Sequence, residues 1–457
     1  MGLRDRFWPL IDLHLGRHCT GQKSRVNGTE TLYVLALRAL VGGFADDPRN
    51  DRYRKEIQQL PVAIRVDVLC DMCDHPSLGD VLLELLADPV EFSNLLQHVP
   101  QKSVKLVCCL QWLESVQKSL PAQLEERYRA IVEGGRRDYR CGLRIGTFLA
   151  DAGWHLQAAT IFKLSLQQTD PRSVEELTVM VQLLRAFASS GRLADGSHVY
   201  QRIKVRLKDI YPQNLTTRGT AEADLCASVY QNFSLYHYEG QEFGLSYLYA
   251  VLSLNLLDRS SNTRLALGVW RQLARACMAQ RYFGRAKLLL EQAISRAGYC
   301  YGLTSTPYAE ALEDYALYLL AQNNAACGEV FMVAQHIYLD LFGSRNLLLS
   351  LAQGNLTFGL CRQAIGVGHR DAALAYVTER LNTFRRMLGQ DHRLVVQLQR
   401  LLVTIRVMPF QDDQSTCGFV PKDSTTIVDV TKLRETVDHP LSIEDVRLAF
   451  YRIRERV

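Results

Sequence analysis

Residues 273–293 read LARACMAQRYFGRAKLLLEQA, and this stretch decides the fold. Small and large residues recur at helical spacing around a central aromatic residue, at Ala274, Cys277, Phe283, Ala286, Leu290 and Ala293. Small side chains allow two helix backbones to approach closely, and the large ones fill the space opposite. This rhythm is typical of a tetratricopeptide unit, which is a helix-turn-helix pair.

The same rhythm recurs along the middle of the chain. An earlier copy consists of Gly146, Leu149, Gly153, Ala158, Phe162 and Ser165, and further units are predicted around residues 184–200, 234–253, 316–335 and 356–384. Turns are marked by Tyr301-Gly302, Phe342-Gly343 and Leu388-Gly389, whose glycines are 41 and 46 residues apart. We therefore predict an all-α, tetratricopeptide-like helical-repeat solenoid, an α-α superhelix. A non-repetitive helical bundle is the alternative, because small residues also fall in helices by chance.

The ends of the chain lack this repeat. We expect an irregular leader over residues 1–28, a helical docking module over 29–135, and about six repeat units over 136–407. Proline residues, Pro409 and Pro421, interrupt the pattern after the last unit. We therefore predict an irregular tail over 408–457 that closes with a helix from Ser442 to Arg454.

Composition excludes several classes of protein. The 53 basic and 48 acidic residues nearly balance, which gives no electrostatic reason to expect nucleic-acid binding. The 12 cysteines are scattered rather than spaced as a disulfide framework, which indicates a reducing compartment. Residues 1–17 lack the apolar core of a signal peptide, and no run is long and apolar enough to span a bilayer. We expect a cytoplasmic or nuclear protein without membrane insertion.

Catalytic and metal-binding signals are weak. Residues 16–24, GRHCTGQKS, approach a phosphate-binding loop, but Gln22 breaks the spacing. Cys70 and Cys73, with His75 nearby, provide half of a zinc site, and no second spaced pair follows. No serine or cysteine lies in a recognisable nucleophile motif. We therefore expect no cofactor, no metal and no catalytic centre, and interpret the chain as a scaffold that binds other proteins.

Two short segments precede the repeats. In the first, Thr31 is followed by Leu32, Ala36 and Leu40 at four-residue steps on one helix stripe, which Gly42-Gly43 is expected to close. In the second, Leu60 and Ile64 flank Pro61, which is well placed to open a helix. Taken alone, each segment is more simply interpreted as an amphipathic helix of the core.

The order and proximity of the two segments favour a different interpretation. The first segment resembles the elongin C-binding box of cullin-2 ubiquitin ligase receptors, with alanine in place of the commoner cysteine, and the second resembles the cullin-2 box that follows it. Residues 148–154, FLADAGW, and the pairs Asp67-Val68 and Asp314-Tyr315 add to a patchy resemblance over residues 29–400 to tetratricopeptide-repeat receptors of these ligases.

The resemblance implies a non-catalytic substrate receptor. Thr31, Leu32, Ala36 and Leu40 would contact elongin C of the elongin B/C pair, and Leu60, Pro61 and Ile64 would contact cullin-2 with its RING subunit. Members of the family capture degradation signals near the C-termini of protein substrates. They are also described as binding a sorting signal of the amyloid precursor protein and as associating with microtubules.

The substrate surface is predicted from helical phase. Counting from Ala316 puts Glu310 and Glu313 on the inner face of a repeat, where two carboxylates could bind an arginine-bearing peptide. A solvated acidic face is the simpler alternative. A different function also fits the repeats alone, since a period near 42 resembles kinesin light chain and would suit an adaptor for cargo or microtubules.

Overall fold

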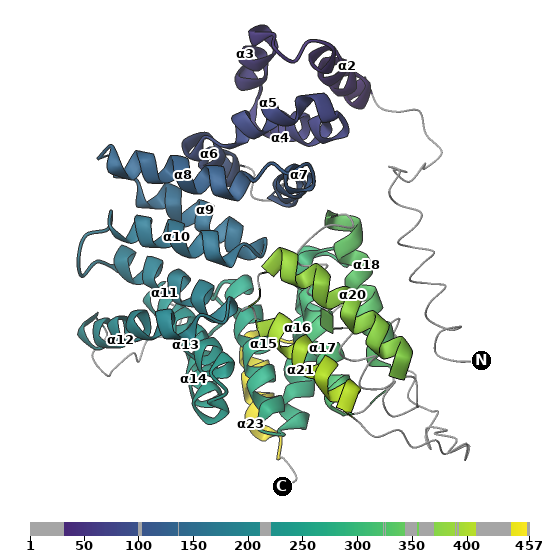
Figure 1. The fold of residues 1–457 in the computed structure, drawn as a ribbon. Coiled ribbons are helices and arrows are strands. Elements are labelled where there is room, and N and C mark those ends of the chain that lie inside the picture. The colour runs from purple at the N-terminus through teal and green to yellow at the C-terminus, as the bar shows by residue number, and fades with distance from the viewer. Residues whose placement is uncertain are drawn as a thin grey trace. The chain divides into compact units, whose positions relative to one another are not determined.

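The computed structural model describes residues 32–98, 103–135, 137–210, 221–322, 326–342, 370–388, 393–407 and 440–454, with residues 324, 354–355 and 390. All elements in these ranges are α-helices or short 3₁₀ turns, which confirms the predicted all-α class (Figure 1). None of the described helices has the length and apolarity needed to cross a bilayer. The chain divides into two compact units, Met1–Arg136 with Leu339–Leu349, and Arg137–Tyr338 with Ser350–Val457.

The N-terminal unit is built from short helices. They are α2 (Leu32–Asp46), α3 (Asp51–Gln59), α4 (Val62–Asp71), α5 (Gly79–Leu86), α6 (Pro89–His98), α7 (Ser103–Ser115) and α8 (Leu120–Glu133), with 3₁₀ turns at Met72–Asp74 and Pro76–Leu78. Helix α4 packs against α2, α3, α6 and α7, so it lies at the centre of the unit. Asn50 caps α3 by accepting a hydrogen bond from the Arg52 backbone N–H at 3.0 Å.

Helix α2 is longer than its sequence predicts. The prediction that Gly42-Gly43 ends it is wrong, because the helix continues to Asp46. Gly43 serves packing instead, since a Cβ atom there would lie 2.8 Å from the Tyr53 hydroxyl. The Tyr53 ring stacks on Phe44 at 5.3 Å, which brings α3 close to α2. The glycine therefore leaves room for a side chain of the neighbouring helix and does not form a turn.

The second unit is a series of helix pairs, and of α18 it includes the residues up to Tyr338. They are α9 (Tyr139–Asp151) with α10 (His155–Leu166), α11 (Val174–Ser189) with α12 (Leu193–Ile210), α13 (Ala221–Glu239) with α14 (Phe243–Leu256), α15 (Thr263–Ala279) with α16 (Phe283–Tyr301), α17 (Thr306–Ala321) with α18 (Cys327–Phe342), and α20 (Arg370–Leu388) with α21 (Arg393–Val407). Consecutive helices from α9 to α17 pack on each other, and each first helix from α9 to α17 also contacts the first helix of the next pair. These first helices form one continuous layer.

The turn inside the first five pairs repeats in atomic detail. The backbone N–H groups of Trp154, Arg192, Glu242 and Tyr282 each donate to the carbonyl five residues earlier, at 2.8–2.9 Å. The residue before each has positive φ, as in a Schellman turn, and it is Gly153, Gly191, Gln241 and Arg281. Asn324 makes the equivalent bond to Leu319 at 2.9 Å. A non-repetitive bundle would not reproduce one turn five times, so the predicted helical-repeat fold is confirmed.

The small-to-large packing of the first repeat also agrees with its sequence. Gly146 of α9 lies against Phe162 of α10, and a Cβ atom at Gly146 would be only 2.5 Å from the ring. Phe162 is completely buried. The turn markers hold as well, since α16, α18 and α20 end at Tyr301, Phe342 and Leu388. Residues 356–369 of the last predicted unit lie outside the described residues.

The chain returns to its middle repeats at the C-terminus. Helix α23 (Ile443–Arg452, yellow in Figure 1) packs against α16 of the fourth pair. The predicted tail segment 408–439 lies outside the described residues.

Candidate functional site

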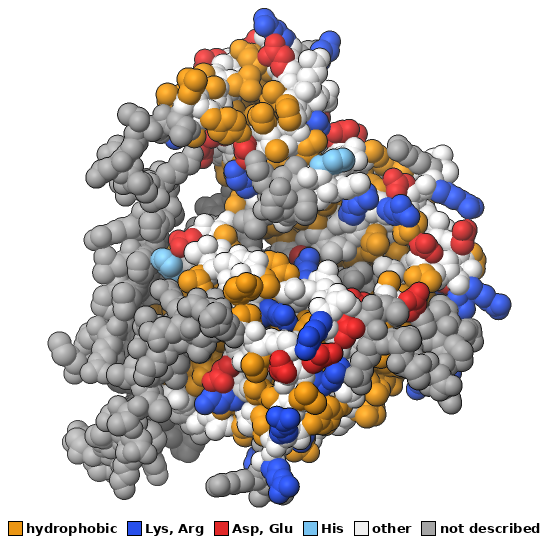
Figure 2. Space-filling model, turned by 180° about the vertical axis from the view of Figure 1, so that it is seen from behind, with side chains coloured by type: hydrophobic (Ala, Val, Ile, Leu, Met, Phe, Trp, Pro, Cys, Tyr) orange, Lys and Arg blue, Asp and Glu red, His pale blue; other side chains and the backbone are white. Residues whose placement is uncertain are grey.

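Helix α2 has one packed face and one open face. Val41 and Phe44 are buried on the face of α2 that faces the rest of the N-terminal unit, where α4 packs against α2. On the other side Leu32 is 83% exposed and Leu35 is 50% exposed, and Ala36 beside them is also exposed. In the space-filling view, hydrophobic side chains gather over the N-terminal helices (Figure 2). An exposed leucine pair on a short helix leaves apolar surface for a partner.

The predicted elongin C-binding residues differ in exposure. Leu32 and Ala36 lie on the open face, Leu40 is half-buried, and Thr31 lies outside the described residues. Leu35, which the sequence reading did not select, contributes to the same open face. Its position three residues after Leu32 is the signal that could have identified it.

Asp67 of α4 fixes α2 in this orientation. The Tyr33 hydroxyl donates to Asp67 Oδ2 at 2.7 Å, and Lys105 Nζ of α7 donates to Asp67 Oδ1 at 2.6 Å. Partial burial and the bond to this carboxylate raise the pKa of Tyr33 to about 12. One carboxylate therefore ties α2 and α7 to the central helix.

The predicted cullin-binding residues lie at the junction of α3 and α4. Leu60 follows the last residue of α3, and Pro61 immediately precedes α4, as its sequence predicted. Pro61 is exposed, whereas Leu60 and Ile64 are half-buried. The Pro61 carbonyl accepts from the Ile64 N–H at 2.9 Å, which starts the helix. Because α2 and α3 both pack on α4, the two predicted segments belong to one compact unit.

A second candidate surface lies on the layer of first helices in the repeats. Asp314 of α17 is fully buried and accepts from Arg271 Nε at 2.6 Å and from Arg275 Nε at 2.7 Å. Arg271 also pairs with Glu310. Burial alone would raise the pKa of Asp314, but the two guanidinium groups outweigh it and hold the pKa below its ordinary value. The carboxylate is therefore ionised and links α15 to α17.

Glu310 and Glu313 have separate partners. Glu310 shares Arg271 with Asp314, one helical turn away on α17. Glu313 accepts from the Tyr338 hydroxyl of α18 at 3.0 Å and from Asn355 Nδ2 at 3.4 Å. Burial, followed by the charge of Asp314, raises the pKa of Glu313 to about 7. A peptide arginine would have to compete with Arg271 for Glu310, whereas Glu313 is directed toward α18.

The sequence reading missed the cations of this cluster. Arg271 and Arg275 are four residues apart on α15, and Glu310 and Asp314 are four apart on α17. Four-residue spacing places each pair on one helix face, which is the signal that could have matched them. A further ion pair on the same layer joins Asp151 of α9 to Arg185 of α11 at 3.0 Å. These charged groups on the layer of first helices therefore already form ion pairs with one another.

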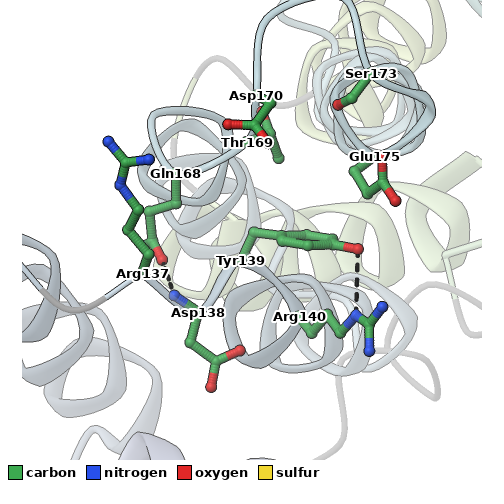
Figure 3. Close-up of a pocket in the computed structure, with 9 residues that line it drawn as sticks. All are labelled: Arg137, Asp138, Tyr139, Arg140, Gln168, Thr169, Asp170, Ser173 and Glu175. Atoms are coloured by element: carbon green, nitrogen blue, oxygen red, sulfur yellow. Dashed lines mark hydrogen bonds between the residues drawn. The ribbon is translucent and has the colours of Figure 1, made fainter.

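The described residues also contain a polar hollow at the start of the repeats. It lies between the beginning of α9 and the α10–α11 connection, and Tyr139 crosses it (Figure 3). The Asp138 backbone N–H donates to Gln168 Oε1 at 2.6 Å, and Arg140 Nε donates to the Tyr139 hydroxyl at 3.2 Å. None of the predicted site residues lines this hollow.

The two cysteines of the half zinc motif, Cys70 and Cys73, lie close to a third cysteine. Cys109 of α7 is buried within hydrogen-bonding reach of the thiols of Cys70 and Cys73. In the described part of the chain, no three cysteine, histidine or carboxylate side chains are grouped in a way that could hold a metal ion. Residues 16–24, the loop-like glycine motif, lie outside the described residues.

Comparison with known proteins finds similarity to curated proteins of two rodents. No family model matches the chain. The chain is similar to amyloid protein-binding protein 2 of Rattus norvegicus and of Mus musculus, with 24% identity over 394 residues in each case. The match covers 82% of this chain and 64% of the length of each curated relative. This level of identity over most of the chain is that of a divergent relative.

Proposed function

We propose that the chain is a non-catalytic substrate-recognition subunit of a cullin-2-RING ubiquitin ligase. In this proposal the docking residues are Thr31, Leu32, Ala36 and Leu40 toward elongin C, and Leu60, Pro61 and Ile64 toward cullin-2. The observation that carries it is the 83% exposure of Leu32 on a helix whose other face is packed. The similarity to amyloid protein-binding protein 2 supports the proposal further, together with the residue patterns of the two box-like segments.

The open face of α2 has the chemistry of a groove-binding helix. Leu32 and Leu35 provide apolar side chains, and Ala36, one turn after Leu32, is small enough for the helix to approach a partner closely. Burying a leucine side chain contributes about 1.5–3 kcal/mol. Two leucines and one alanine can therefore anchor a helix in an apolar groove, with the half-buried Leu40 at its edge.

The repeats would hold the substrate. In this proposal Glu310 and Glu313 on the layer of first helices contact the substrate, and Glu310 exchanges its pairing with Arg271 for an arginine of the bound peptide. The chain would then act by proximity, because holding a substrate beside a ligase raises its effective concentration.

The test uses the full chain with purified elongin B/C and cullin-2. We expect the wild type to co-purify with them, and the double variant Leu32→Asp/Ala36→Asp to lose at least about 100-fold in affinity, because two charges would enter an apolar groove. The control is Val205→Asp, which changes a side chain of α12 that is 59% exposed. Failure of the wild type to bind either partner, or full binding by the double variant, would end the proposal.

The adaptor alternative requires the repeats but not α2. If elongin C binding is absent while a transport cargo binds the repeats, and the Leu32→Asp/Ala36→Asp variant binds that cargo unchanged, the adaptor function replaces the ligase function. The same purification therefore separates the two.

A further inference from the structure

Helix α23 is a short amphipathic helix with a defined start. The Ser442 hydroxyl accepts from the Asp445 N–H at 3.1 Å and caps the helix. Ile443, Val446 and Phe450 are buried against the repeats, at spacings of three and four residues. Leu448, on the opposite side, is 51% exposed. The buried residues therefore form one stripe that faces the repeat array.

Polar contacts orient α23 on the second helices of two neighbouring repeats. Arg447 Nη1 donates to the carbonyl of Leu257, the residue that follows α14, at 2.7 Å. The Arg285 guanidinium of α16 lies 5.0 Å from the centre of the Phe450 ring. The Tyr451 hydroxyl donates to Asn255 Oδ1 of α14 at 2.8 Å. The surface formed by α14 and α16 thus recognises both the apolar stripe and the arginine of this helix.

The N-terminal end of α23 is also held by the repeats. The Leu441 N–H donates to Gln292 Oε1 of α16 at 3.1 Å, and Glu444 pairs with Arg259 at 2.9 Å. The acidic residue lies in the first turn of α23, where it also suits the helix dipole. The contacts therefore define the direction of the bound helix as well as its face.

The binding surface is larger than the helix it holds. Leu248 and Leu252 of α14 share a stripe with Asn255, at four- and three-residue steps, and they are 51% and 37% exposed. Tyr451 of α23 reaches only the Asn255 end of this stripe. A longer amphipathic helix could therefore bury apolar surface of α14 that α23 leaves open.

The helix has little stability of its own. Its 10 residues are fewer than an isolated helix needs to be stable in water. Because residues 408–439 join it to α21, it remains at a high effective concentration near its site after release. These are the properties expected of a tethered ligand of the repeats.

We propose that α14 and α16 form a helix-binding groove, that α23 is its intramolecular occupant, and that an amphipathic partner helix with the pattern Ile-x-x-Val-Arg-x-x-Phe displaces it. The groove lies on the second helices of the repeats, and it does not depend on the proposed ligase function. Recognition there is regulated by the chain's own C-terminus.

The test measures binding of a fluorescent peptide of residues 440–454 to the full chain. The variant Val446→Asp releases the chain's own helix by placing a charge in the groove. We expect this variant to bind the peptide at least about tenfold more tightly than the wild type does, because the internal competitor is gone. Adding Arg285→Ala to the Val446→Asp variant should lower its affinity for the peptide by about tenfold or more.

Two peptides provide the matched control. A Phe450→Ala peptide loses a fully buried ring and should bind at least about tenfold more weakly, whereas a Leu448→Ala peptide, changed on the exposed side, should bind within about twofold of the parent. Equal weak binding of the parent peptide to both chains would overturn the proposal. The proposal would also be overturned if the molecular mass doubled with increasing protein concentration and returned to that of a monomer when peptide was added. In that case the α23 helix of a second copy would occupy the groove.

Hydrogen exchange on the wild-type chain gives a result that needs no variant. We expect the amides of residues 446–452 to exchange at least about tenfold faster than those of residues 286–297 in α16, because α23 opens by itself. If both segments exchange at the same slow rate, or if Val446→Asp unfolds the repeats, α23 is an integral part of the core and the proposal is wrong.

Discussion

Glu313 makes the stability of the repeats depend on pH. The carboxyl is partly buried between α17 and α18, where Tyr338 and Asn355 donate to it, Asp314 repels its charge and Arg271 attracts it. Burial dominates, and it raises the pKa from 4.5 to about 7. The folded chain therefore holds this proton more tightly than the unfolded chain does.

The sign and size follow from linkage. A raised carboxyl pKa gives stability that is fully present below about pH 4.5 and is lost as the pH rises to about 7. One pKa unit corresponds to about 1.4 kcal/mol, so the rise from 4.5 to about 7 sets an upper limit of about 3–4 kcal/mol on the penalty for ionised Glu313 above pH 7. Since the side chain is only partly buried, solvent reduces this figure.

The variant Glu313→Gln removes the titrating group and keeps an oxygen for the Tyr338 hydroxyl. We expect the variant to be about 1–3 kcal/mol more stable than the wild type at pH 8, and of nearly equal stability at pH 5. The assay is urea unfolding followed by circular dichroism at both pH values. The control is Glu329→Gln, which changes an exposed carboxylate of α18 and should shift stability by less than about 0.5 kcal/mol. A Glu313→Gln effect that is the same at pH 5 and pH 8 would refute the reasoning.

Two further predictions concern packing and charge. Gly146→Ala should destabilise the repeats by about 1–3 kcal/mol, because the added Cβ would collide with Phe162. By contrast, Gly244→Ala should stabilise α14 by about 0.5–1 kcal/mol, because nothing lies within 4 Å of the added Cβ. Thermal unfolding of both variants checks the pair, and a stabilising Gly146→Ala would contradict the close helix contact. Asp314→Asn should cost about 3 kcal/mol, because it leaves Arg271 and Arg275 without their buried carboxylate. A change in the urea midpoint too small to measure would show that the two arginines do not need it.

The sequence by itself determined the helices, their pairing and the repeated turn. Apolar residues at three- and four-residue steps define a helix through contacts between neighbours in the chain, so α15 and α16 follow from residues 273–293. The Schellman turn is equally local, since its defining bond spans five residues. Tyr301-Gly302 marked the end of α16 for this reason, and the Gly302 φ of +86° fits the residue that follows a helix.

The tertiary structure decided which faces remain open and which charges meet. Leu32 and Val41 both lie on α2, and the packing of the rest of the unit against one face of α2 separates the exposed side chain from the buried one. The pairing of Arg271 with Asp314 joins residues 43 positions apart. Arg447 and Leu257 are 190 positions apart. Such contacts have no local signature, because the groups that satisfy a buried charge or an apolar stripe become neighbours only when the chain has folded.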